Sequence, residues 1–158
     1  MQKITTFLTY DGRAEEAVKL YTSIFKNSKI VSVNKYPEGG PAPAGSVMTI
    51  AFQLEGQDFV ALNGGSMFTF SMGISLMVSC ETQAQVDDLW EKLSAGGGEK
   101  GPCGWVKDKF GVSWQVVPTA LMPMITDKDP KKAQRTMAAM MTMTKLDIAA
   151  LKRAHEQG

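Results

Sequence analysis

The sequence predicts an α+β fold made of two tandem βαβββ modules followed by a helical tail. Three observations support this prediction. Strand-like and helical segments follow one another in the same order twice, and the apolar positions of the two helices coincide when one is shifted by 69 residues. The composition changes after Pro118, where helical segments rich in methionine begin. We expect modules at residues 1–66 and 67–118 and a tail at 119–158, and the 158 residues are enough to bury one core in a single compact domain.

The first module begins with a β-prone segment, Lys3–Tyr10, which Asp11-Gly12 ends. Apolar residues then recur at steps of three and four from Ala14 to Phe25, which is the pattern of a helix with one buried face. Three strands are predicted after this helix, at Lys29–Tyr36, Ser46–Leu54 and Asp58–Asn63. The first two are separated by the Gly/Pro-rich loop Pro37–Ser46.

The second module repeats this order. A strand is predicted at Met72–Ser79, and Thr82 begins a helix in which Gln85 is placed to complete a capping box. Three short strands follow, at Gly97–Gly101, Trp105–Lys107 and Val112–Val117.

Alternation along the strands predicts that each sheet has one buried and one open face, because successive side chains of a strand point to opposite sides. In the last strand the apolar side is Val112, Trp114 and Val116, and the other side is Ser113 and Gln115. Two further strands have apolar sides that we expect to face the helices, with the members Met48, Ile50, Phe52, Leu54, Ile74, Leu76, Val78 and Cys80. Their opposite sides are small, polar or soft and suit the lining of a cavity.

The tail holds six of the eleven methionines, Met122, Met124, Met137, Met140, Met141 and Met143. Asp129 and Pro130 are predicted to begin one helix, and Thr144 with Asp147 to begin another. Two interpretations stay open. The methionines either form an adaptable apolar contact with the sheet or with a partner subunit, or they complete the core.

The charge balance argues against two classes of partner. Seventeen basic and sixteen acidic residues give a net charge of +1, so neither nucleic acid nor an anionic membrane is expected to bind. No apolar run approaches the roughly 20 residues of a membrane span, and the first residues lack the apolar core of a signal peptide. We therefore expect a cytoplasmic protein whose two cysteines, Cys80 and Cys103, are reduced thiols.

Several segments resemble a known family. They are Tyr10–Phe25, Phe59–Gly65, Phe68–Leu93, Cys103–Pro118 and, in the tail, Asp129–Ala154. They resemble the 3-demethylubiquinone-9 3-methyltransferase-like branch of the vicinal oxygen chelate superfamily, to which glyoxalase I, extradiol dioxygenases and fosfomycin and bleomycin resistance proteins belong. The resemblance implies that the two modules form a concave, mixed, eight-stranded surface, that small molecules bind in the concavity and that the protein is a homodimer.

The resemblance also indicates candidate site residues. Metal enzymes of the superfamily take their ligands from the first and last strands of each module, and these positions correspond here to Thr6, Asn63, Ser75 and Gln115. Because all four side chains are neutral, we expect no metal site and no cofactor. We assign them to ligand binding, with the alternative that they bond to one another or to water in a vestigial cavity. The only histidine, His155, is expected to be a solvated residue near the C-terminus.

Other candidates have ordinary structural explanations. Cys103 is expected to be a structural thiol, and Asp108 a solvated turn residue. Tyr10, Trp105 and Phe110 either line the cavity or pack in the ordinary way.

Two functional hypotheses follow. The first is a binding protein for a small, partly apolar organic molecule. The second is an enzyme that acts without a metal on a quinone-like or aromatic molecule. A methyltransferase activity rests on the family label alone, because Gly96–Gly98 follows a helix and indicates a helix stop instead of a methyl-donor loop. The residues leave open whether any reaction is catalysed.

Overall fold

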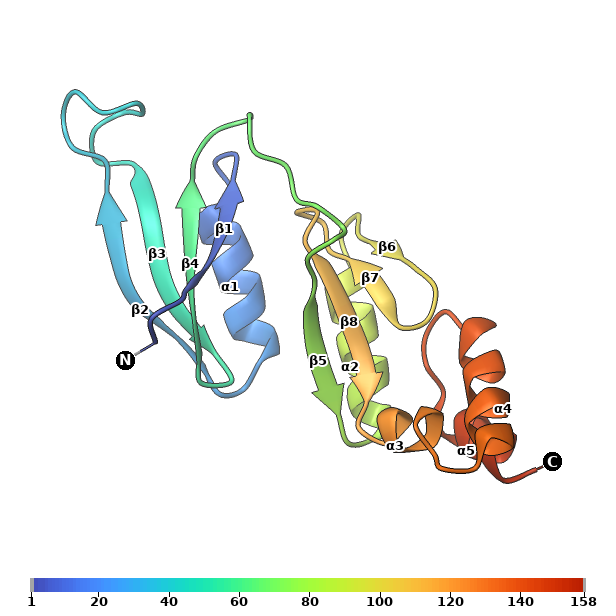
Figure 1. The fold of residues 1–158 in the computed structure, drawn as a ribbon. Coiled ribbons are helices and arrows are strands. Elements are labelled where there is room, and N and C mark those ends of the chain that lie inside the picture. The colour runs from blue at the N-terminus through green and yellow to red at the C-terminus, as the bar shows by residue number, and fades with distance from the viewer. Residues whose placement is uncertain (1, 158) are drawn as a thin grey trace. The chain divides into compact units, whose positions relative to one another are not determined.

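A computed structural model describes residues 2–157 and shows two compact units, Met1–Thr69 and Phe70–Gly158 (Figure 1). The boundary predicted from the sequence, 66/67, lies three residues before the boundary between these units, and the sequence predicts the tail, 119–158, as a segment of its own. In the structure the tail belongs to the same unit as the second module. No helix of the described residues is long and apolar enough to cross a bilayer.

Unit 1 is a βαβββ module. Its elements are β1 (Thr6–Tyr10), α1 (Ala14–Ile24), β2 (Ser28–Lys35), β3 (Val47–Leu54) and β4 (Gln57–Asn63). The strand order is β1-β4-β3-β2, with β1 parallel to β4 and the other pairs antiparallel. The first strand, β1, therefore lies at one edge of the sheet, and the last strand, β4, lies beside it in the interior of the sheet (Figure 1).

The predicted alternation holds in unit 1. Ile50, Phe52 and Leu54 are buried on the side of the sheet that α1 covers, and the apolar stripe of α1 is buried with them. Tyr10 lies on the same side, where its hydroxyl donates to the Tyr21 hydroxyl of α1 over 3.2 Å. Tyr10 is therefore a packing residue.

Unit 2 repeats the topology. It contains β5 (Leu76–Cys80), α2 (Gln83–Ser94), β6 (Glu99–Lys100), β7 (Trp105–Lys107) and β8 (Ser113–Pro118), in the strand order β5-β8-β7-β6. The predicted capping box of α2 is present, because the Thr82 hydroxyl accepts from the Gln85 amide at 3.2 Å and Gln85 Oε1 accepts from the Thr82 amide at 3.3 Å. Val112, Trp114 and Val116 are buried as predicted.

The strand start that differs most from the prediction is that of β5. β5 begins at Leu76 instead of Met72, and Ile74 is 73% exposed instead of buried. The cause is a turn that keeps the chain out of the sheet. Ser71 accepts from the Gly73 amide through its hydroxyl and from the Ile74 amide through its carbonyl.

The tail forms three helices, α3 (Leu121–Ile125), α4 (Pro130–Met141) and α5 (Ile148–Glu156). Asp129 caps α4 as predicted. α5 begins later than predicted, because Asp147 alone is its cap and accepts from the Ala150 amide at 2.9 Å, and α3 was not predicted. A small core joins the helices, with the buried members Leu121, Met124, Leu146 and Leu151. Met124 is buried in this core, whereas Met122 and Met141 are exposed, and a contact of the exposed methionines with a partner subunit stays a prediction.

Candidate ligand-binding face

Each sheet has one face covered by its helix and one that we call the open face. In unit 2, α2 covers the side that carries Val106 and Trp114. The open face of this sheet presents a row of three side chains across three neighbouring strands, because Met77 of β5 and Trp105 of β7 are both register partners of Gln115 in β8. A thioether, an amide and an indole therefore lie next to one another.

Ser75 adds a hydroxyl to this row. Gln115 Nε2 donates to Ser75 Oγ over 2.8 Å, and both side chains are half-buried. Within residues 2–157 the Ser75 hydroxyl donates to no protein acceptor, and Gln115 Oε1 accepts from no protein donor. One hydrogen-bond donor and one acceptor are thus available at the same place.

The other two predicted site residues, Thr6 and Asn63, lie elsewhere. Asn63 is the register partner of Tyr10, so its side chain lies on the face that α1 covers. Its Oδ1 accepts from the Ala14 amide at the start of α1 over 2.9 Å, and its Nδ2 donates to the Val47 carbonyl over 3.1 Å. Asn63 therefore joins α1 to β3.

Thr6 alternates in phase with the buried Leu8 and Tyr10, so it also lies on the helix-covered face of unit 1. It is four positions from the residue of β1 that pairs with Asn63. The structure thus brings Ser75 and Gln115 together on the open face of unit 2, and within unit 1 it places Thr6 and Asn63 on the helix-covered face. The role of the four residues in ligand binding stays a prediction.

The displacement of Thr6 has a simple cause. The two helices correspond at an offset of 69 residues, but β1 and β5 correspond at an offset of 70, since Thr6–Tyr10 matches Leu76–Cys80. Three residues separate β1 from α1, whereas two separate β5 from α2. When the offset of the helices is used to align β1 with β5, the alignment of the two strands is wrong by one residue. An error of one residue assigns every side chain of the strand to the opposite face of the sheet.

At the corrected offsets, the counterparts of Ser75 and Gln115 in unit 1 are Thr5 and Val60. A valine has no donor atom, and the other three residues offer neutral oxygens or amides. These positions do not fit a divalent ion, which favours imidazole, thiolate or carboxylate ligands. Among residues 2–157, no three side chains of His, Cys, Asp and Glu are placed to hold a metal ion.

A buried carboxylate was missed in the sequence. Asp108 is only 2% exposed, not solvated as expected. Its Oδ1 accepts from the amides of Phe110 and Val112 at 2.9 and 3.0 Å, and its Oδ2 accepts from Trp114 Nε1 at 2.9 Å. The aspartate followed two residues later by an aromatic-glycine turn was the available signal. Asp108 thus organises the turn between β7 and β8.

The expectation for His155 was wrong. Its Nε2 lies 2.8 Å from Asp127 Oδ2, and its side chain is only 17% exposed. Hydrogen bonds lower the pKa of the Asp127 carboxyl, first from the Asp129 amide and then from His155. The pair ties α5 to the segment before α4, and Arg135 of α4 donates to the carbonyl of His155 at 2.8 Å. His155 is therefore partly buried because α4 packs on α5.

Two βαβββ units with this strand order define the glyoxalase-like fold of the vicinal oxygen chelate class. The model of the 3-demethylubiquinone-9 3-methyltransferase family matches residues 2–117, and the chain belongs to this family. The match ends before the tail, so it does not cover the predicted resemblance of Asp129–Ala154.

Solved structures agree with this assignment. A PhnB protein of Bacillus cereus with the same family description is 40% identical, with a TM-score of 0.64 over 75% of this chain and 100% of its own. Protein PA1353 of Pseudomonas aeruginosa shares the fold at 19% identity, with a TM-score of 0.60 over 75% of this chain and 98% of its own. A search of the curated proteins found no match.

Proposed function

We propose that the protein binds a small, partly apolar organic molecule on the open face of unit 2. The observation that carries this proposal is the row of Met77, Gln115 and Trp105, with Ser75 bonded to its central amide. Binding sites for small molecules are mostly apolar and contain a few placed polar groups that fix the orientation of the ligand.

The chemistry of the row suggests the kind of ligand. The Trp105 indole offers a flat surface to an aromatic or other planar group, and the Met77 thioether adapts to irregular apolar shapes. The Ser75 hydroxyl donates to a ligand carbonyl, and Gln115 Oε1 accepts from a ligand hydroxyl or N–H. A planar molecule with a carbonyl or hydroxyl group at its edge satisfies all four residues.

We further propose that the protein is a homodimer in the cytoplasm and has neither nucleic acid nor a membrane as a partner. The family resemblance supports the dimer. The exposed Phe7 on the open face of unit 1 supports a contact of this face with a second subunit. The net charge of +1 and the free thiols of Cys80 and Cys103 support the other statements.

The alternative hypothesis, a metal-free enzyme on a quinone-like or aromatic molecule, stays a prediction. The one buried carboxylate described above, Asp108, accepts from three protein N–H groups, so no observation favours it as a proton carrier. Methyltransferase activity rests on the family description alone.

Native mass spectrometry of the purified protein tests the proposal. We expect an organic molecule of low mass to be retained by the parent and lost, at equal fold content, from Gln115→Leu. If the same molecule is retained equally by Gln115→Leu, the site lies elsewhere. A stoichiometric metal ion that survives desalting, with or without added zinc, nickel, manganese or magnesium, would contradict the argument from the donor set.

A further inference from the structure

The turn between β6 and β7 is hydrogen-bonded to the C-terminal tail. The Cys103 amide donates to the Met143 carbonyl over 2.8 Å, and the Gly104 amide donates to the Thr144 carbonyl over 2.7 Å. Gly104 has a φ of +83°, and a Cβ there would lie 2.8 Å from the Val116 carbonyl oxygen and 3.0 Å from a methyl carbon of Leu146. Only glycine lets the turn approach the tail this closely.

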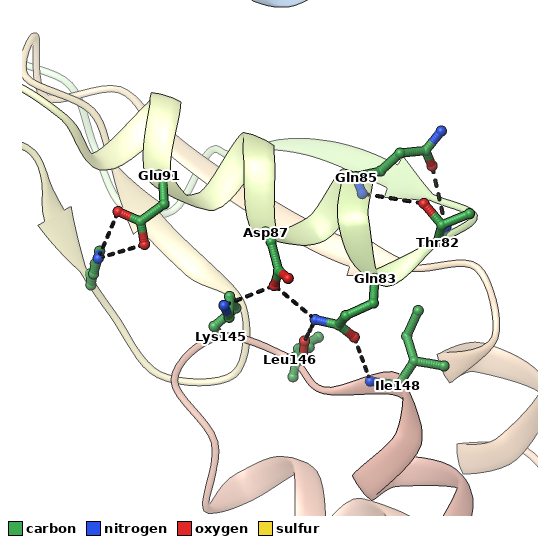
Figure 2. Close-up of polar contacts among 9 residues, drawn as sticks. Thr82, Gln83, Gln85, Asp87, Glu91, Lys145, Leu146 and Ile148 are labelled. Carbon is green, nitrogen blue, oxygen red and sulfur yellow. Dashed lines mark hydrogen bonds and ion pairs between the residues drawn. The ribbon is translucent and has the colours of Figure 1, made fainter.

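The tail segment that holds the turn is itself attached to α2. We call residues 142–147 the tail connection. Figure 2 shows that the side-chain amide of Gln83 in α2 makes two hydrogen bonds to the backbone at the end of this segment. Its Nε2 donates to the Leu146 carbonyl at 3.0 Å, and its Oε1 accepts from the Ile148 amide at 2.8 Å. Asp87, one turn further along α2, pairs with Lys145 at 2.8 Å and accepts from Gln83 at 3.0 Å.

The turn that the tail holds is continuous with β7, which carries Trp105 on the open face of unit 2. Trp105 follows Gly104 directly, and its amide donates to the Pro102 carbonyl within the same turn at 3.0 Å. A restraint on Cys103 and Gly104 therefore limits the movement of the strand that carries Trp105. Besides the tail, β7 has β8 on one edge, where the Gly104 carbonyl also accepts from the Val116 amide at 2.8 Å, and only the two-residue strand β6 on the other.

We propose that the C-terminal tail is a restraint on the β6–β7 turn that fixes Trp105, and that Gln83 is the positioning residue that keeps the tail connection in place. The family match ends at residue 117, and the Bacillus cereus relative aligns over its whole length with three quarters of this chain. The tail connection thus lies outside the residues that the family model matches. The consequence of the restraint, a more ordered aromatic wall and a narrower choice of planar ligands, rests on the proposed function.

Hydrogen exchange of the full chain, followed amide by amide by NMR, tests the restraint without any ligand. In Gln83→Leu we expect the Cys103 and Gly104 amides to exchange about tenfold faster than in the parent, because the tail connection opens more often. Asp87→Ala should act in the same direction with a smaller effect. The matched control is Asp88→Ala, since Asp88 pairs with Lys92 of its own helix at 2.7 Å and not with the tail.

Faster exchange of the Ile148 amide with unchanged exchange at Cys103 and Gly104 would overturn the proposal, because the tail would then open without freeing the turn. Equal acceleration in Asp88→Ala would overturn it as well. If Gln83→Leu does not fold, Asp87→Ala carries the test. The proposed function is tested separately with acetophenone, a planar aromatic ketone, as the probe. Failure of the parent to bind acetophenone would count against the proposed function and would leave the exchange result unaffected.

Discussion

Gln115 and Ser75, forty positions apart in the sequence, are joined by a hydrogen bond of 2.8 Å from Nε2 to Oγ. The bond spans from β8 to the residue before β5, and it holds the amide of Gln115 in one orientation on the open face. A site whose polar groups are already oriented loses less conformational freedom on binding. We therefore expect the pair to lower the conformational cost of binding at the proposed site.

Asn63 should contribute to the stability of unit 1 through its two hydrogen bonds. In Asn63→Ala the Ala14 amide and the Val47 carbonyl lose their partner. We expect the free energy of unfolding to fall by about 1–3 kcal/mol in a urea titration. Asn34→Ala is the control, because Asn34 is exposed and bonds to the Thr49 hydroxyl, and its loss should stay within about 0.5 kcal/mol. Equal stability of Asn63→Ala and parent would contradict this structural role.

Asp108 and Trp114 should be energetically coupled. In Asp108→Asn the remaining side-chain oxygen can still accept from the Val112 amide, but the new NH₂ group faces the Trp114 Nε1–H. Both of these groups are donors, so no hydrogen bond forms between them. We expect a loss of about 2–3 kcal/mol in the free energy of unfolding. Because Trp114→Phe removes the same bond, the double variant should lose clearly less than the sum of the two single variants. Strict additivity would show that the bond contributes nothing.

The contact between Asp87 and Lys145 predicts a pH window for tail docking. The hydrogen bond from Lys145, and next that from Gln83, lowers the pKa of Asp87, and the same pairing raises the pKa of Lys145. The contribution of Asp87 is complete above its unfolded pKa of about 3.9 and is lost as the pH falls through the lower folded value. The contribution of Lys145 is complete below about 10.4 and is lost as the pH rises through the higher folded value.

This window can be measured by NMR titration of the Asp87 carboxyl carbon and the Ile148 amide. We expect both to report one transition below the usual range of an aspartate, and Lys145→Ala to move it upward. A transition of Asp87 at or above its usual pKa would contradict the assigned pairing.

The two thiols should differ in reactivity. Burial raises the pKa of Cys80 to about 11, and its side chain is 1% exposed, whereas Cys103 is half-buried in the turn. Because the thiolate is the nucleophile, iodoacetamide at neutral pH should label Cys103 about tenfold faster or more in the folded protein. Peptide mass spectrometry measures the two rates, and urea should abolish the difference. Similar rates in the folded state would be inconsistent with the buried position of Cys80.

Much of the fold could be predicted because it rests on local patterns. The helical stripe from Ala14 to Phe25, the capping box at Thr82 and the alternation around Trp114 each depend on neighbours in the sequence. The candidate site could be predicted in unit 2, where Ser75 and Gln115 do meet.

The rest depends on information that the sequence pattern does not carry. The connection between β1 and α1 is one residue longer than that between β5 and α2, so the predicted position in β1 is wrong by one residue and Thr6 lies on the covered face. The hydrophobic pattern of the strands and helices does not give the length of such a connection. The bonds of Asn63, Gln83 and His155 join segments that lie far apart in the chain. Such contacts become visible only when the elements are placed in space.

The central claim is that the open face of unit 2 binds a planar organic molecule through Gln115. Protein labelled with ¹³C at the methionine methyl groups tests it most directly, with acetophenone as the probe. Met77 reports on the face, and Met122 is the control, since the two are 59% and 55% exposed. Gln53→Leu is the matched control variant, because Gln53 lies on the open face of unit 1 and bonds to Asp58 at 2.7 Å.

We predict that acetophenone shifts the Met77 methyl signal and not that of Met122. Gln115→Leu should weaken this binding about tenfold while it leaves folding intact, and Gln53→Leu should not change it. A Met77 signal that does not respond, or one that responds equally in the parent and in Gln115→Leu, would contradict the claim.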